Sequence, residues 1–173
     1  MIQTEHLLLR PYAPDDLLAL IEQPEIFEAL TGFPASPRLR DFMISPDVSP
    51  AWTASLRTIQ GPDPWRLGFA VIDKETRSVI GAASFKGPPN ATGTVEIAYG
   101  IVPSFEGRGY ATEAAHALVD YAQKNEQVRQ IIAHTMPEPN ASTHVLKKCG
   151  FTFAGEVIDP EDGQVWRWEY AEV

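Results

Sequence analysis

The 173-residue sequence contains one cysteine, Cys149, so no disulfide can form within the chain, and a reducing compartment is the natural expectation. Basic residues are also scarce. Lys and Arg number 14 against 23 Asp and Glu, which gives a formal net charge of -9. A chain this acidic offers no broad basic face to a phosphate backbone, so no nucleic acid is expected as a partner. The acidic excess leaves room for a cationic substrate, although it is more often only solvated surface.

Long apolar runs are missing too, and none approaches the length that spans a membrane. Residues Met1 to His6 have no basic segment followed by an apolar stretch, as a secretory signal would. We therefore expect no membrane partner and a cytoplasmic location. No metal site is expected either, because the four histidines and the cysteine show no ligand spacing.

What the sequence does contain is typical of a folded protein. Apolar residues make up 44% and aromatic residues 10%, and no repeat, low-complexity segment or linker divides the chain. A chain of this length buries roughly two thirds of its unfolded surface, enough for one substantial core. We expect a single domain over residues 1–173.

The apolar patterning predicts alternating strands and helices. The expected strands are 7–10, 67–73, 79–86, 94–102, 130–135, 151–157 and 165–170. The expected helices are 15–23, 24–30, 50–60, 111–122 and 140–149. Residues 31–50 carry four prolines and no period, so they are expected to form a mobile connection, either a substrate lid or an irregular surface segment. Together these elements predict an α+β fold around one mixed sheet.

The most informative stretch runs from Glu96 to Glu113, where an apolar strand turns through two glycines directly into a helix. A helix start has unpaired N–H groups and the positive end of the dipole, and both favour an anion. Gly107 and Gly109 allow a diphosphate to approach the backbone, and Arg108 adds a positive charge. The stretch lacks both the Gly-Lys-Ser/Thr of a P-loop and the third glycine of a dinucleotide fingerprint. A plain strand-to-helix corner is the alternative.

Residues 106–111, Glu-Gly-Arg-Gly-Tyr-Ala, resemble the phosphate-binding motif Arg/Gln-x-x-Gly-x-Gly/Ala of the GCN5-related N-acetyltransferases, the GNAT superfamily. The first position departs from it, with glutamate in place of arginine or glutamine. Three further segments are similar to the ribosomal-protein N-terminal acetyltransferase branch, the RimJ/RimL type: Tyr110 to Ala114, Asn140 to Phe151, and the opening Leu7 to Tyr12 with the acidic pair at 15–16. The resemblance covers nearly the whole chain.

This resemblance implies a mostly antiparallel sheet, flanked by helices and splayed open between the parallel strands 94–102 and 130–135. The pantetheine arm of acetyl-CoA would lie in that split and pair with backbone groups near Ile101 and Val102, beside a bulge at Gly100. The implied cofactor-binding residues are Ile101, Val102, Gly107, Arg108, Gly109, Ala111, Thr112 and Asn140. Asn140 has two interpretations, since it can cap a helix without any ligand, whereas the asparagine of this family motif also contacts the pantetheine arm.

Glu96 is the expected general base. It lies on the strand face opposite the apolar side chains, next to the small residues Ala98 and Gly100. A protonated amine must lose a proton before it attacks a thioester, and a nearby carboxylate can take that proton. The position also resembles the base of the family's histone-type members. The alternative is a structural glutamate on a solvated sheet edge.

The general acid is less well defined, because many family members have a tyrosine where this chain has Leu146. Ser142 is a weak candidate, and a thiol with an ordinary pKa of about 8.5 leaves without a strong acid. The implied function is acetyl transfer from acetyl-CoA to a primary amine by direct attack in a ternary complex. The acceptor is a protein N-terminal α-amine or a small-molecule amine. A noncatalytic acyl-CoA-binding or sensing domain is the alternative, and the oligomeric state, including a homodimer, is left open.

Overall fold

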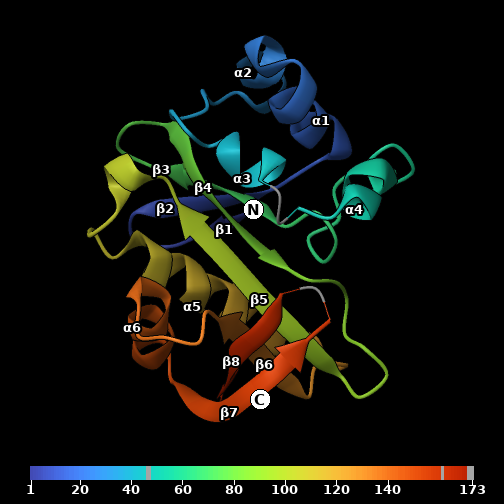
Figure 1. Cartoon of the computed structure of the whole chain (residues 1–173). Coiled ribbons are helices and arrows are strands. Elements are labelled where there is room, and N and C mark those ends of the chain that lie inside the picture. The colour runs from blue at the N-terminus through green and yellow to red at the C-terminus, as the bar shows by residue number, and fades with distance from the viewer. Residues whose placement is uncertain (46–47, 161, 171–173) are drawn as a thin grey trace.

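The structure is a computed structural model, and it describes residues 1–45, 48–160 and 162–170 of the chain. The strands of this part form one sheet in the order β1-β2-β3-β4-β5-β6-β8-β7 (Figure 1). Neighbouring strands are antiparallel except β5 and β6, which are parallel. The strands are β1 (Ile2–Gln3), β2 (Leu7–Pro11), β3 (Phe69–Asp73), β4 (Ser78–Phe85), β5 (Thr94–Ile101), β6 (Gln130–Thr135), β7 (Phe151–Asp159) and β8 (Gly163–Tyr170). The predicted α+β fold with one mixed, mostly antiparallel sheet is confirmed.

The helices are α1 (Pro14–Glu22), α2 (Phe27–Thr31), α3 (Asp41–Ile44), α4 (Pro50–Ser55), α5 (Tyr110–Gln123) and α6 (Ala141–Lys148), with 3-10 turns η1 (Pro24–Ile26) and η2 (Pro103–Phe105). A proline begins both α1 and α4, where its fixed φ suits a first helical turn. The α4 helix ends at Ser55 rather than near Gln60, as the sequence had suggested. None of the described helices combines the length and apolar character that spanning a membrane requires.

The splayed sheet is confirmed by the short pairing between β5 and β6. Only residues 94–96 of β5 pair with residues 130–132 of β6. Beyond Glu96, β5 stays paired with β4, so within the described residues its other edge has no strand beside it. Figure 1 shows β5 crossing the middle of the molecule while β6, β7 and β8 gather at one of its ends.

The bulge expected at Gly100 is wrong. The β4–β5 ladder runs from Gly81 to Phe85 without a register shift, and the Val102 N–H continues it by donating to the Ile80 carbonyl at 2.8 Å. Close packing instead requires glycine at position 81, because a Cβ there would lie 2.2 Å from the Gly100 carbonyl oxygen. A Cβ on Gly100 itself would meet Phe42 of α3 at 3.4 Å, an ordinary contact distance.

The segment 31–50 was expected to be a mobile connection, but its described part is built into the fold. Backbone hydrogen bonds join Ser36 and Pro34 to Val79 at the start of β4, at 2.9 Å each. Leu39 is fully buried, and α3 follows at once. A four-residue helix is too short to show a period, and the prolines around it conceal the pattern. Residues 46–47 lie outside the described residues.

The two faces of β5 are covered by different helices. Tyr99, on the odd-numbered face, donates its hydroxyl to the Ser142 carbonyl of α6 at 3.4 Å, so this face is turned toward α6. The α5 helix packs on β2, β4 and β5 through a buried apolar row, namely Ala114, Ala115, Leu118, Val119 and Ala122, as the sequence period predicted. Glu96 lies on the other face with Gly100, on the side of Phe42 and α3.

Candidate active site

The glycine loop before α5 leaves a helix start open. Gly107 and Gly109 have φ of +74° and +85°, which L-residues other than glycine rarely adopt. A Cβ added at either position would meet no atom within 4 Å. Gly109 caps α5, and its carbonyl accepts the Glu113 amide at 3.0 Å. The amides of residues 110–112 therefore have no acceptor within the helix, and the predicted anion site at this helix start stays a prediction. Ala111 and Thr112 are half-buried in this first turn.

Arg108 stands between the two glycines and is exposed. Its guanidinium lies 4.9 Å from the centroid of the Phe105 ring and donates to the Ser104 carbonyl at 3.4 Å. The side chain is thus folded back onto η2, where a cation–π contact holds its charge beside the loop. Glu106, at the position where the family usually has arginine or glutamine, is exposed.

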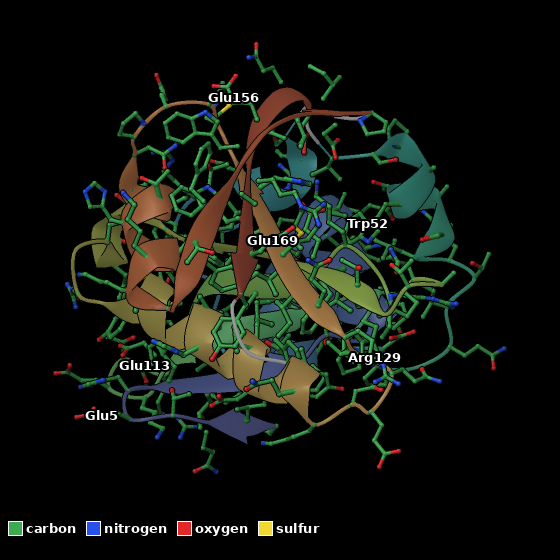
Figure 2. All side chains as sticks on the ribbon, turned by 90° about the horizontal axis from the view of Figure 1, so that it is seen from below. Glu5, Trp52, Glu113, Arg129, Glu156 and Glu169 are labelled. Carbon is green, nitrogen blue, oxygen red and sulfur yellow. The ribbon has the colours of Figure 1, made fainter. Side chains whose placement is uncertain are left out.

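Two side chains fix the start of α5, and the sequence analysis assigned a role to neither. The Tyr110 hydroxyl donates to the carboxylate of Asp73 at 3.2 Å. Glu113 accepts the His6 amide at 2.7 Å and also binds the Thr4 hydroxyl. In Figure 2, Glu113 lies beside the N-terminal segment that carries Glu5. Burial alone would raise the pKa of Glu113, but the hydrogen bonds from Thr4 and His6 outweigh burial and lower its pKa.

The split beside β5 presents backbone groups of Tyr99 and Ile101. In the β4–β5 ladder the even-numbered residues bond to β4, as the Lys86 N–H to Glu96 carbonyl bond at 2.9 Å illustrates, so the odd-numbered residues turn theirs toward β6. Val102 differs from Ile101 in this respect. Its N–H donates to Ile80, and its carbonyl accepts the Phe105 amide at 2.9 Å. Of the two residues expected to pair with pantetheine, Ile101 has its backbone groups facing the split.

Glu96 lies where the split begins, and it is not on a solvated edge. Its side chain is 14% exposed, and its Oε1 lies 3.1 Å from the Lys86 ammonium. Lys86 also contacts Asp162 in the β7–β8 turn at 2.9 Å. Burial would lower the pKa of Lys86, but hydrogen bonds and charge from Asp162 and Glu96 raise it above its usual range. The ammonium is therefore charged at neutral pH, and it ties β5 to the hairpin.

His134 of β6 also faces Glu96, with Nδ1 3.2 Å from Oε1, and the same nitrogen lies 3.8 Å from the Asp159 carboxylate. Donor atoms of these three residues lie within 4.8 Å of one another, a set that could hold a metal ion. The Lys86 ammonium, however, already provides a cation beside Glu96. The spacing of the histidines along the sequence had given His134 no role. The signal in the sequence is a histidine within an apolar strand, which lies on the same face as Glu96 once the two strands are in register.

The region around α6 contains the remaining predicted residues. Asn140 caps the helix: its side-chain oxygen accepts the Thr143 amide at 3.0 Å, as its capping interpretation predicted. Ser142 is half-buried in the first turn, where its carbonyl accepts the Tyr99 hydroxyl. Burial, together with the nearby Cys149, raises the pKa of Tyr99, so this hydroxyl stays protonated at neutral pH. Leu146, at the position where many family members have a tyrosine, is 1% exposed and packs in the core.

Cys149 is buried, and burial raises the pKa of its thiol to about 11. A thiol of this kind is protonated and unreactive at neutral pH. Two hollows of the described surface, one beside the turn at 89–93 and one beside the start of α1, contain none of the candidate site residues.

A family model for the acetyltransferase (GNAT) domain matches residues 6–152. The chain therefore belongs to the GNAT family of acetyltransferases, as its motifs predicted. It is 27% identical over 111 residues to the uncharacterized N-acetyltransferase YjdG of Bacillus subtilis strain 168, covering 64% of this chain and 61% of the relative. It is 29% identical over 102 residues to the ribosomal protein uS5-alanine N-acetyltransferase of Escherichia coli K12, covering 57% of this chain and 52% of the relative. The matches span about half to three fifths of these relatives.

The fold is also that of solved family structures. RimL, the ribosomal L7/L12 alpha-N-protein acetyltransferase in complex with coenzyme A, superposes with a TM-score of 0.64 at 15% sequence identity, over 98% of this chain and 96% of RimL. At this identity the likeness concerns the fold alone. The uS5-alanine relative supports the predicted RimJ/RimL-like branch.

Proposed function

We propose that this protein is an acyl-CoA-dependent N-acetyltransferase that moves the acetyl group of acetyl-CoA to a primary amine by direct attack in a ternary complex. The observation that carries the proposal is the continuity of β5. One strand has Glu96 at the start of the split, a backbone edge along the split that no described strand pairs with, and an open helix start beyond its far end. A base for the amine, a free strand edge for the pantetheine arm and an anion site for the diphosphate are what acetyl transfer from acetyl-CoA requires.

The residues of the chain fit acetyl-CoA. The diphosphate would accept hydrogen bonds from the amides of the loop, from Gly107 and Gly109 to Ala111 and Thr112, with the charge of Arg108 beside it. The open space above both glycines supports this assignment. The pantetheine arm would pair with the edge of β5 at Ile101, between this strand and the start of α6. We keep Val102 and Asn140 as proposed contacts at the two walls of the split.

The chemistry follows from Glu96. The amine nitrogen forms a bond to the carbonyl carbon after its ammonium loses a proton to Glu96, and the C–S bond then breaks. Both contacts described for Glu96 fall on Oε1. Among the described residues, this leaves Oε2 for the acceptor. The departing thiolate takes a proton, for which Ser142 and the neighbouring Tyr99 hydroxyl are the proposed donors.

The acceptor is proposed to be a protein N-terminal α-amine or a small-molecule amine. The E. coli relative is named for an alanine of ribosomal protein uS5. The carboxylates of Glu96, Asp159 and Asp162 suit an acceptor that arrives as a cation. The proposal includes a cytoplasmic location, no required metal and no nucleic-acid or membrane partner, with a homodimer to be tested by light scattering.

A screen of amines with acetyl-CoA, followed by release of free thiol, tests the proposal. We expect saturable thiol release that depends on both substrates, and a product whose mass has increased by one acetyl group. If calorimetry gave tight acetyl-CoA binding while no α-amine, polyamine, aminoglycoside or amino acid was acetylated, the noncatalytic acyl-CoA-binding alternative would replace the proposal.

A further inference from the structure

The side chain of His134 is 9% exposed, yet neither ring nitrogen has a hydrogen-bond partner among the described residues. Buried polar groups without partners are rare in folded proteins, because the water lost on burial is not replaced. The other histidines do not share this situation. His6 contacts Glu113, His144 contacts the Asn140 carbonyl, and His116 is exposed on α5.

The ring is held between two carboxylates. Its Nδ1 is 3.2 Å from Glu96 and 3.8 Å from Asp159. The Glu96 distance is within hydrogen-bond range, although the present geometry forms no hydrogen bond. Catalytic hydrogen bonds are often long or misaligned before a substrate binds.

Resting on the proposed function, we infer that His134 is a positioning residue for Glu96 that accepts the proton Glu96 removes from the acceptor ammonium. Glu96 is the group that touches the amine, and His134 acts through it. Imidazole suits this role because its two protonation states are both accessible near neutral pH, and each ring nitrogen can carry a proton.

The protons balance over one turnover. The ammonium gives its first proton to Oε2 of Glu96, the carboxyl group turns so that this O–H faces His134, and the unprotonated Nδ1 takes the proton and releases it to solvent. The neutral amine forms the C–N bond, the C–S bond breaks, and the second proton on nitrogen ends on the thiolate. The products are the acetamide, coenzyme A thiol and one released proton.

Charged groups from four elements surround the ring of His134. Glu96 faces it from β5 and Asp159 from β7, while Lys86 sits beyond Glu96 and bridges to Asp162. Arg167 of β8 lies opposite His134 across the two strands, and its guanidinium forms an ion pair with Glu169. Figure 2 labels Glu169 on the β7–β8 hairpin. Two carboxylates are thus adjacent to the ring, and each of the two cations nearby has its own carboxylate partner.

The test compares pH profiles of kcat/KM for the wild type and three variants. His134→Asn keeps a hydrogen-bonding atom near the Nδ1 position but does not titrate, and His134→Phe keeps a ring without nitrogens. His116→Asn is the matched control on the exposed face of α5. Thermal melting and acetyl-CoA calorimetry establish that each variant is folded and binds its donor.

We expect both His134 variants to lose about 10-fold or more in kcat/KM at neutral pH, less than the roughly 10²-fold at which direct general-base assistance begins, because His134 acts through Glu96. One inflection of the wild-type profile should disappear in both. In the Glu96→Gln background, His134→Asn should cost little more, because residues acting in series are not additive. His116→Asn should superpose on the wild type.

Several outcomes would overturn the inference. A His134→Asn profile within about twofold of the wild type at every pH removes the proton-accepting role. So do losses that simply multiply in the double variant. If Glu96→Gln is inactive while His134→Asn is unaffected, the proposed function stands and only this inference fails. If the wild type acetylates no amine, the proposed function fails first and the inference with it.

Discussion

The two ends of β5 carry parts of the candidate site that are built differently, one from backbone amides and the other from side chains. At its C-terminal end, the loop from Gly107 to Thr112 is one contiguous run that offers backbone amides. At its N-terminal end, the Glu96 cluster is made of side chains brought by β4, β5, β6 and the β7–β8 hairpin. The loop should therefore tolerate changes of side chain and fail when its backbone changes, whereas the cluster should show the reverse. Three substitutions test this contrast.

The largest effect is expected at Glu96. Glu96→Gln keeps the shape of the side chain but removes the base, so kcat/KM should fall by roughly 10² or more while acetyl-CoA affinity is retained. The deficit should shrink at high pH, where the free amine is abundant without help. Steady-state kinetics across pH and calorimetry measure both, with the exposed Glu126→Gln as control. A variant within about threefold of the wild type throughout the pH range would leave Glu96 with a structural role.

The next effect is expected at Gly109, where the backbone matters. Gly109→Val places a branched side chain at φ +85° in the open space proposed for the diphosphate. Acetyl-CoA affinity should fall about 100-fold, the equivalent of losing one or two hydrogen bonds to a charged group. Gly61→Val is a matched control, because Gly61 also has positive φ, +72°, and open space, but lies far along the chain from the loop. Equal affinity losses in the two folded variants would contradict the phosphate-loop assignment.

The smallest effect is expected at Glu113, whose carboxylate joins the start of α5 to the N-terminal segment at Thr4 and His6. Its pKa is lowered from the ordinary value of 4.5, so its carboxylate contributes stability above that value, and this contribution is lost as the pH falls through the folded pKa. Glu113→Gln should lower the free energy of unfolding by about 1–2 kcal/mol at neutral pH. The difference from the wild type should vanish in acid. Urea unfolding at a series of pH values measures it, and a pH-independent difference would assign the effect to packing.

The contrast also explains what could be predicted from sequence. The glycine loop before α5 is contiguous in the sequence, so its glycines and the helix period after it could be recognised, as could the Asn140 cap and the glycine that ends α6. These features depend on local backbone preferences. They needed no knowledge of which strands become neighbours.

The acceptor side could not be found in that way. Lys86, His134, Asp159 and Asp162 meet Glu96 only because of the strand order and the parallel register of β5 and β6. The false bulge at Gly100 has the same origin, because the pairing of β5 with β4, which runs past Gly100 without a register shift, is a contact between separate strands. Long-range contacts set both features, and a one-residue change of register would remove them.

The short pairing between β5 and β6 has a consequence for the stability of the protein. Three residue pairs join the two halves of the sheet, and beyond them two strand edges diverge inside the molecule. A substrate that lies along one of these edges would also take the place of a neighbouring strand in the sheet. Its binding adds to the free energy of unfolding by mass action, by about 2.7 kcal/mol at 100 times its dissociation constant. Supply of the donor would then set how long the protein survives proteolysis as well as how fast it works, and amide exchange along residues 97–101 should slow when acetyl-CoA is added.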